Sequence, residues 1–234
     1  MKKSFVSIIA IAIALGFSQA SLAQKEEHQA PAPGLVELEK GAFQSTWVKP
    51  EIDFRQYTRV VIAQEGVTEY RDVGPAKKSR SFMLRSNESE FGIPDVDRER
   101  IERNAGDSFV KAFAKSKHYE VIDDANVEVP VKGTLLLRGH MLDVVSKVPP
   151  PMAGASSVYG NIMGEATLVI ELIDAETGEM VGFAAERSKI QRSGGSSVDT
   201  MAEVNSVTAL AEVRRWASRA GSRLAKALDE AYKS

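Results

Sequence analysis

Two strand-like segments joined by a tight turn limit the possible folds more than any other part of the sequence. Glu165–Asp174 and Met180–Gln191 are rich in apolar and β-branched residues, and Asp174–Gly178 (DAETG) joins them. In such a turn the glycine supplies a positive φ that other residues avoid. The preceding run, Lys132–Lys147, is long and apolar on both of its alternating sets of residues. We therefore predict an antiparallel meander of three strands.

Two further strands and one helix precede the meander. Arg59–Gln64 (RVVIAQ) and His118–Ile122 have the composition of strands, and 66–92 is a charged stretch that we expect to be irregular. A helix is predicted to begin at Pro94–Asp95, because acidic residues favour the positive end of a helix dipole. Four apolar residues then recur every fourth position, which predicts an amphipathic face: Ile101, Ala105, Phe109 and Phe113.

A second helix is predicted over Asn205–Tyr232, at the end of the chain. One row of this helix carries mostly small side chains: Ala209, Val213, Ala217, Gly221 and Ala225. Such a row allows close packing against a sheet or against another helix. Leucines lie beside the row: Leu210, Leu224 and Leu228.

The order of these elements, without an internal repeat, predicts one α+β domain over residues 35–234. We expect a single-domain sandwich in which two main helices cover one face of a mixed, largely antiparallel sheet. The chain has 234 residues, of which 43% are hydrophobic and 26% charged, and this composition fits one ordinary globular domain.

The N-terminus has the pattern of a secretory signal peptide. Met1–Lys3 is basic, and Phe5–Phe17 is an apolar run too short to span a bilayer as a stable helix. Ser21 and Ala23 offer small residues at the positions that a signal peptidase reads. We predict a signal peptide over 1–23, cleaved after Ala23, and a flexible tether over 24–34. The alternative is an uncleaved anchor. Export places the protein in the periplasm, with peripheral attachment to the outer membrane as a further option.

The chain contains no cysteine, and this absence excludes several kinds of chemistry. Disulfides, thiolate metal sites, cysteine nucleophiles and a lipid anchor on a cysteine at the cleavage point are all excluded. After the N-terminal run, no stretch of 18 uninterrupted apolar residues occurs, so we expect no transmembrane span in the mature chain. The net charge of −2 gives no argument for nucleic acid as a partner.

No assembled catalytic or metal-binding motif is present. His118 and His140 form no i, i+4 pair, and structural roles are favoured for both. Ser108-x-x-Lys111 matches a nucleophile motif, but its partner motifs are missing. Asp95–Glu99 lacks the glycine of a calcium loop and is better explained as a helix start. Walker, G-x-S-x-G and G-x-G-x-x-G motifs are also missing. We predict that the protein is not an enzyme, that it has no catalytic or metal-binding residues and that it binds no cofactor.

Four segments together resemble a bacterial family of unknown function. They are Val48–Val61, Tyr119–Asp123, Glu171–Glu179 and the final helix around Trp216. Members of that family are mostly described as lipoproteins of the cell envelope. The resemblance implies an envelope location and supplies no catalytic residues. The chain differs from the family pattern in lacking the lipid-bearing cysteine.

Two loops are expected to meet at one end of the sheet, because the 174–178 turn lies at the other end. These loops are 148–164 and 192–197, and the first carries several apolar side chains that a solvated connector does not need. The alternatives are a loop packed on itself and a surface for docking a partner. The candidate docking residues are Met152, Val158, Tyr159, Ile162 and Met163.

The final helix also carries a basic band. The basic residues can simply form the solvent-exposed face of the helix, opposite the small residues. Alternatively, they contact an anionic partner in the cell envelope. The candidate contact residues are Arg215, Arg219, Arg223 and Trp216.

The sequence favours an exported protein with a non-catalytic binding or accessory role in the cell envelope. Its partner would be an envelope protein or a lipid-associated molecule. One alternative is an envelope hydrolase whose carboxylate pair meets only in three dimensions. Another is a carrier that holds a small apolar ligand in a pocket between the final helix and the sheet.

Overall fold

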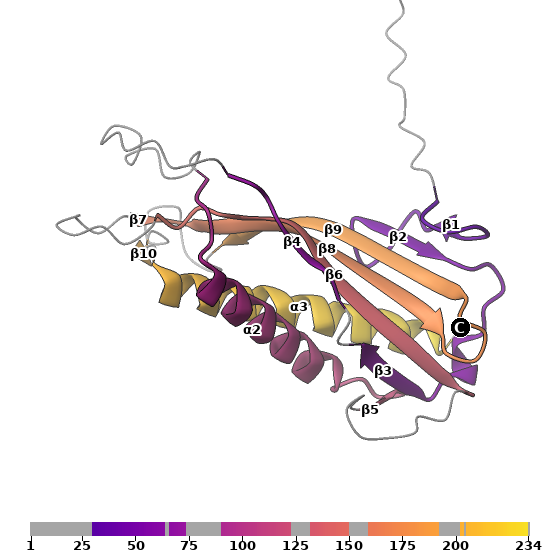
Figure 1. The fold of residues 1–234 in the computed structure, drawn as a ribbon. Coiled ribbons are helices and arrows are strands. Elements are labelled where there is room, and N and C mark those ends of the chain that lie inside the picture. Colours follow the sequence, from indigo (N-terminus) through magenta and orange to yellow (C-terminus); the bar gives the residue numbers. More distant parts are fainter. Residues whose placement is uncertain are drawn as a thin grey trace, which may run out of the picture.

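The predicted meander forms the centre of an eight-stranded mixed sheet (Figure 1). β6 (Thr134–Ser146), β8 (Ile162–Asp174) and β9 (Met180–Gln191) pair antiparallel in that order. This computed structural model describes residues 30–63, 66–73, 90–122, 132–149, 159–191, 202–203 and 205–233. The predicted signal peptide and the start of the tether lie outside these residues.

The turn between β8 and β9 has the predicted geometry. Gly178 adopts a φ of 70°, and its N–H donates to the Asp174 carbonyl at 2.8 Å. The Asp174 carboxylate accepts the backbone N–H groups of Glu176 and Thr177 at 2.8 and 3.0 Å. Burial raises the pKa of Asp174, but these bonds and one from the Tyr57 hydroxyl outweigh it and hold the pKa below its usual value. The turn is therefore fixed by its own side chain and by Tyr57.

Shorter strands extend the meander on both sides. The sheet order is β1-β2-β9-β8-β6-β3-β5, with β4 pairing β6 beyond the end of β3. The bounds of these strands are β1 (Val36–Glu37), β2 (Ser45–Val48), β3 (Arg59–Ala63), β4 (Thr68–Tyr70) and β5 (Glu120–Ile122). β3, β4 and β5 run parallel to their neighbours, which makes the sheet mixed.

The prediction of an irregular stretch over 66–92 is wrong at β4. This strand has only three residues, and it is defined by backbone pairing to β6 rather than by an apolar alternation. A separate two-stranded sheet, β7 (Tyr159–Gly160) with β10 (Ala202–Glu203), was likewise not predicted.

The two predicted helices lie side by side on one face of the sheet (Figure 1). They are α2 (Asp95–Phe113), which begins where predicted, and α3 (Ser206–Ala231), which lies within a residue of its predicted bounds at each end. Asn205 caps α3, because its side chain accepts the Thr208 N–H at 3.0 Å while the Thr208 hydroxyl accepts the Asn205 N–H at 3.1 Å. The α+β prediction, with two helices on one face of a mixed sheet, is confirmed.

The small residues of α3 allow its backbone to contact α2. A Cβ atom at Gly221 would lie 2.5 Å from the carbonyl oxygen of Phe109, so a larger residue cannot fit there without a shift. Val213, Ala217 and Ala225 of the same row are buried. The large side chains beside the contact fill the core between helices and sheet: Val60, Phe113, Leu135, Leu137, Ile170, Trp216 and Leu224.

The end of α3 is tied to the segment that leaves α2. The Asp229 carboxylate accepts the Ser116 hydroxyl at 2.6 Å and the backbone N–H groups of Lys117 and His118. The His118 ring stacks on Tyr232 with centroids 4.2 Å apart. His118 therefore has a structural contact in the fold, at the junction of the two helices.

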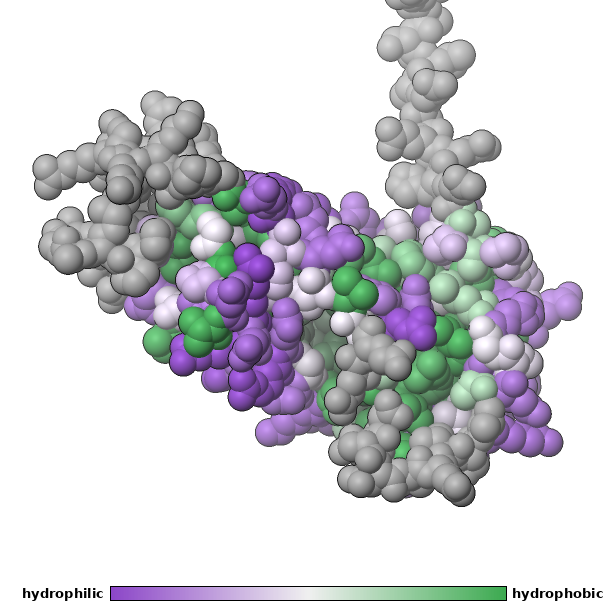
Figure 2. Space-filling model, in the orientation of Figure 1, coloured by the Kyte–Doolittle hydropathy of each residue, from purple (hydrophilic) through white to green (hydrophobic). Residues whose placement is uncertain are grey.

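The molecular surface differs between the two layers. In Figure 2, hydrophilic residues cover the exposed side of α2, and hydrophobic residues gather where β6, β8 and β9 run in Figure 1. Among the described residues, no helix is both long and apolar enough to cross a membrane.

Replacing Gly221 with Ala should destabilise the protein by about 1–3 kcal/mol, because the new methyl group overpacks the contact with Phe109. The loss should occur although Ala has the higher helix propensity. Gly106 is the matched control, since a Cβ there meets nothing within 4 Å, and Gly106→Ala should stabilise by about 0.5–1 kcal/mol. Urea unfolding of both variants measures the difference. Equal effects would contradict the close helix contact.

Candidate functional site

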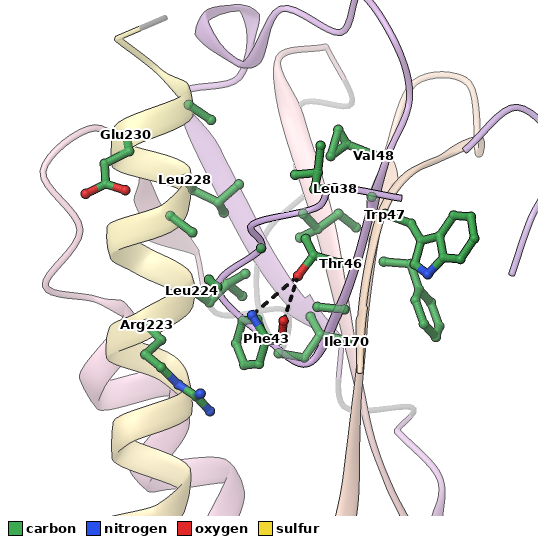
Figure 3. Close-up of a pocket in the computed structure, with 18 of the residues that line it drawn as sticks. Leu38, Phe43, Thr46, Trp47, Val48, Ile170, Arg223, Leu224, Leu228 and Glu230 are labelled. Carbon is green, nitrogen blue, oxygen red and sulfur yellow. Dashed lines mark hydrogen bonds between the residues drawn. The ribbon is translucent and has the colours of Figure 1, made fainter. Parts of the chain in front are cut away.

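A pocket of about 460 Å³ opens between the C-terminal half of α3 and the neighbouring strands β2, β8 and β9 (Figure 3). Its volume lies within the roughly 300–1,000 Å³ typical of small-molecule sites. The pocket lies where the carrier alternative places one, between the final helix and the sheet.

The hollow exists because small side chains face each other across the gap. On β9 the residues that line the pocket include Gly182 and Ala184, and on α3 they include Ala227 and Ala231. Ile170 and Leu172 of β8 complete an apolar floor. Small residues on both surfaces leave space that larger ones would fill. The sequence contained this signal, since Gly182 and Ala184 alternate on one face of a predicted strand.

The outer wall is the segment that leads into β2. A Cβ at Gly41 would lie 2.2 Å from Thr46 Oγ1, so glycine is required for this tight approach. The Thr46 hydroxyl accepts the Phe43 N–H at 3.3 Å and fixes the Phe43 side chain against the pocket (Figure 3). Leu38 is exposed and also lines the pocket, so apolar surface continues to the mouth. In the same view the Trp47 ring lies on the opposite side of β2 from α3.

Arg223 and Glu186 form an ion pair beside the pocket. Arg223 donates two hydrogen bonds to the Glu186 carboxylate, at 2.7 and 3.0 Å, and its guanidinium lies 4.6 Å from the centre of the Phe43 ring. The Ser188 hydroxyl also donates to Glu186, at 2.7 Å. Burial raises the pKa of Glu186, but the bonds from Arg223 and Ser188 outweigh it, so the pKa lies below its usual value. This pair locks α3 to β9 at one side of the pocket.

The predicted basic band is not one uniform surface. Trp216 is 5% exposed and belongs to the core, so its prediction as a contact residue is wrong. The reason is its helical position, because it lies on the same side of α3 as Ala220 and Leu224. Arg215 pairs with Glu212 one turn earlier, and Arg219 is exposed. Arg223 forms an ion pair with Glu186.

The five candidate docking residues do not form one surface among the described residues. Met152 and Val158 lie outside the described residues, and Tyr159 belongs to β7. Ile162 is half-buried at the start of β8, whereas Met163 is 3% exposed in the core, so its assignment to an exposed docking surface is wrong.

β8 begins at Ile162, three residues before the predicted start at Glu165, and Gly164 explains the difference. The sequence pattern indicated a loop through this glycine. In the structure a Cβ at Gly164 would lie 2.5 Å from the Val145 carbonyl oxygen, so glycine is needed for close pairing with β6.

A second polar cluster lies on the sheet. Asp143, at a bulge of β6 with a φ of 53°, accepts hydrogen bonds from Arg71 at 2.7 and 2.5 Å and from Arg187 at 2.7 Å. Hydrogen bonding to Arg71 holds the pKa of Asp143 below its usual value. Glu90 binds both Arg71 and Lys147, and Glu165 binds Arg187, so three cations face three carboxylates. These residues hold β4 and β9 to the sheet.

The remaining sequence candidates occupy structural positions. His140 Nδ1 accepts the Val67 N–H at 3.1 Å, and Ser108 and Lys111 lie on α2. Within the described part of the chain, no group of three or more His, Asp or Glu side chains could hold a metal ion.

Comparisons with known proteins give distant structural neighbours. No protein-family model and no curated protein matches the chain. Among solved structures, it is similar to XCC0632 from Xanthomonas campestris, described as DUF330, at a TM-score of 0.37 and 12% identity, covering 78% of this chain and 90% of that one. It is also similar to the PelC dodecamer from Paraburkholderia phytofirmans, at a TM-score of 0.33 and 13% identity, covering 76% and 94%.

A third similar structure is a neuraminyllactose-binding hemagglutinin homolog from Helicobacter pylori, at a TM-score of 0.34 and 12% identity, covering 75% and 84%. Similarity at this level carries no argument about function.

Replacing Glu186 with Gln should make unfolding less sensitive to acid. A carboxyl whose pKa is lower in the folded state contributes stability above its unfolded pKa, and loses it as the pH falls through the folded pKa. Near pH 7 the free energy of unfolding of the variant should be about 1 kcal/mol lower than that of the wild type. Between about pH 5 and pH 3 acidification should reduce the free energy of unfolding less for the variant than for the wild type. Urea unfolding at several pH values measures this. Parallel pH curves for the two proteins would contradict the ion pair.

Proposed function

We propose that the protein is an exported, non-catalytic binding protein of the cell envelope. We further propose that its binding site is the pocket between α3 and the strands β2, β8 and β9. The single observation that carries this proposal is the pocket itself, whose floor and walls are mainly apolar. A concave, largely apolar site of this size is the usual form of a small-molecule site. The ligand, or the part of it that enters, is accordingly apolar.

The location in this proposal rests on the N-terminal sequence. The basic start, the short apolar run and the small residues before Gln24 are the features of a cleavable signal peptide. The mature protein would begin at Gln24 and act in the periplasm or at the periphery of the outer membrane.

The hydrolase alternative receives less support from the described residues. A general acid at neutral pH needs a carboxyl whose pKa is raised, usually by an apolar environment. The described carboxyl groups with a shifted pKa are all shifted down: Asp53, Asp143, Asp174, Glu186 and Asp229. Each of them accepts hydrogen bonds that favour the ionised form.

The accessory role would use a different surface. Capture of an envelope protein at the loop end stays a proposal that depends on Met152 and Val158, with Ile162 at its border. Deleting residues 152–162 removes the start of β8 as well as the loop, so single substitutions at Met152 and Val158 are the better test of that surface.

Ala227→Phe should block the pocket. The larger side chain enters the space from α3, and binding of the neutral apolar dye N-phenyl-1-naphthylamine should weaken by about tenfold or more. Dye fluorescence titration measures the affinity.

Ala211→Phe is the matched control, because Ala211 is half-buried on the same helix and is absent from the pocket lining. It should leave dye binding within about twofold of the wild type, with circular dichroism showing that both variants fold. If the dye does not bind the wild type, or if Ala227→Phe binds it as well as Ala211→Phe does, the pocket is not the binding site.

A further inference from the structure

We infer that the ligand of the pocket is a single-chain anionic amphiphile, whose apolar chain lies between α3 and the sheet and whose carboxylate or phosphate head lies at the mouth. This inference rests on the proposed function and adds the charge and shape of the ligand. It is carried by the distribution of charged residues around the apolar walls.

The charged residues that line the pocket are mostly basic. Lys40, Arg223 and Lys226 carry positive charge, and among the described residues of the lining Glu230 alone carries negative charge. In Figure 3 the Glu230 carboxylate points away from Leu38 and Val48 on the opposite wall. Because Glu186 neutralises Arg223, the positive charge left for a ligand comes from the two lysines.

Both lysines are available to an incoming anion. Lys226 lies 3.8 Å from Glu230, with side chains that are 78% and 64% exposed, and solvent-exposed pairs of this kind are weak. Lys40 is exposed and forms none of the ion pairs found among the described residues. Neither lysine would have to break a buried contact to bind a head group at the mouth.

The walls set where the head can lie. The interior is formed by aliphatic and aromatic side chains such as Ile170, Leu172 and Leu224, and a charge placed among them would lose its hydration without gaining a partner. The charged head must therefore stay at the rim, where the long lysine side chains can reach it. An apolar interior with a basic mouth matches a fatty acid or an alkyl phosphate, and it disfavours a cationic amphiphile.

The test compares ligands with the same chain and different heads. Decanoate, decyl phosphate and the neutral decyl glucoside are titrated by calorimetry below their micellar concentrations into the wild type and into the double variant Lys40→Glu, Lys226→Glu. We expect the double variant to bind the anionic ligands roughly tenfold more weakly and to bind decyl glucoside within about twofold of the wild type. Raising the salt concentration should reduce the difference for the anions.

The matched control reverses two exposed lysines at the C-terminal end of α2 and just beyond it, Lys111→Glu and Lys115→Glu, which changes the net charge equally and lies outside the pocket lining. It should leave all three affinities unchanged. If the wild type binds the neutral and anionic ligands equally, or if the control weakens the anions as much as the double variant does, the charge inference is wrong while the pocket stands. If none of the three ligands binds, the proposed function fails with it.

Discussion

The contact between the backbones of α2 and α3 at Gly221 determines much of this architecture. Because Gly221 has no side chain, α3 approaches Phe109 closely, and the two helices share one core above the sheet. The same helix carries Ala227 and Ala231 farther along, where they line the pocket. Small residues therefore have opposite effects on one helix, since they allow contact at one point and leave a hollow at the next.

The long elements of the fold could be predicted from the sequence because each has its own periodic signal. The 174–178 turn predicted the β8–β9 hairpin, and the recurrence of apolar residues at every fourth position predicted α2. The short strands β1, β2 and β4 carry no such signal, because two to four residues cannot show an alternation. They form through backbone pairing with strands that are distant in the sequence, which a local pattern does not contain.

The site was predicted less well than the fold, for a related reason. The carrier alternative placed a pocket between the final helix and the sheet, and the structure has one there. Its lining residues were not identified, because Phe43 and Leu38 come from the segment without regular structure that joins β1 to β2. The arginines were identified as one basic band, yet Arg223 reaches Glu186 whereas Arg215 reaches Glu212. Helical spacing indicates which face a residue occupies, but it does not indicate which strand lies opposite.

The outer wall of the pocket lies at the edge of the sheet, and this has a consequence for ligand size. β1 is two residues long, and β2 is held to β9 through four residue pairs, so few backbone hydrogen bonds hold this wall. Segments held by few such bonds separate from a fold at a lower free energy than its core strands. The largest molecule that the protein admits is then governed by the free energy of parting β2 from β9, rather than by the volume of the closed cavity.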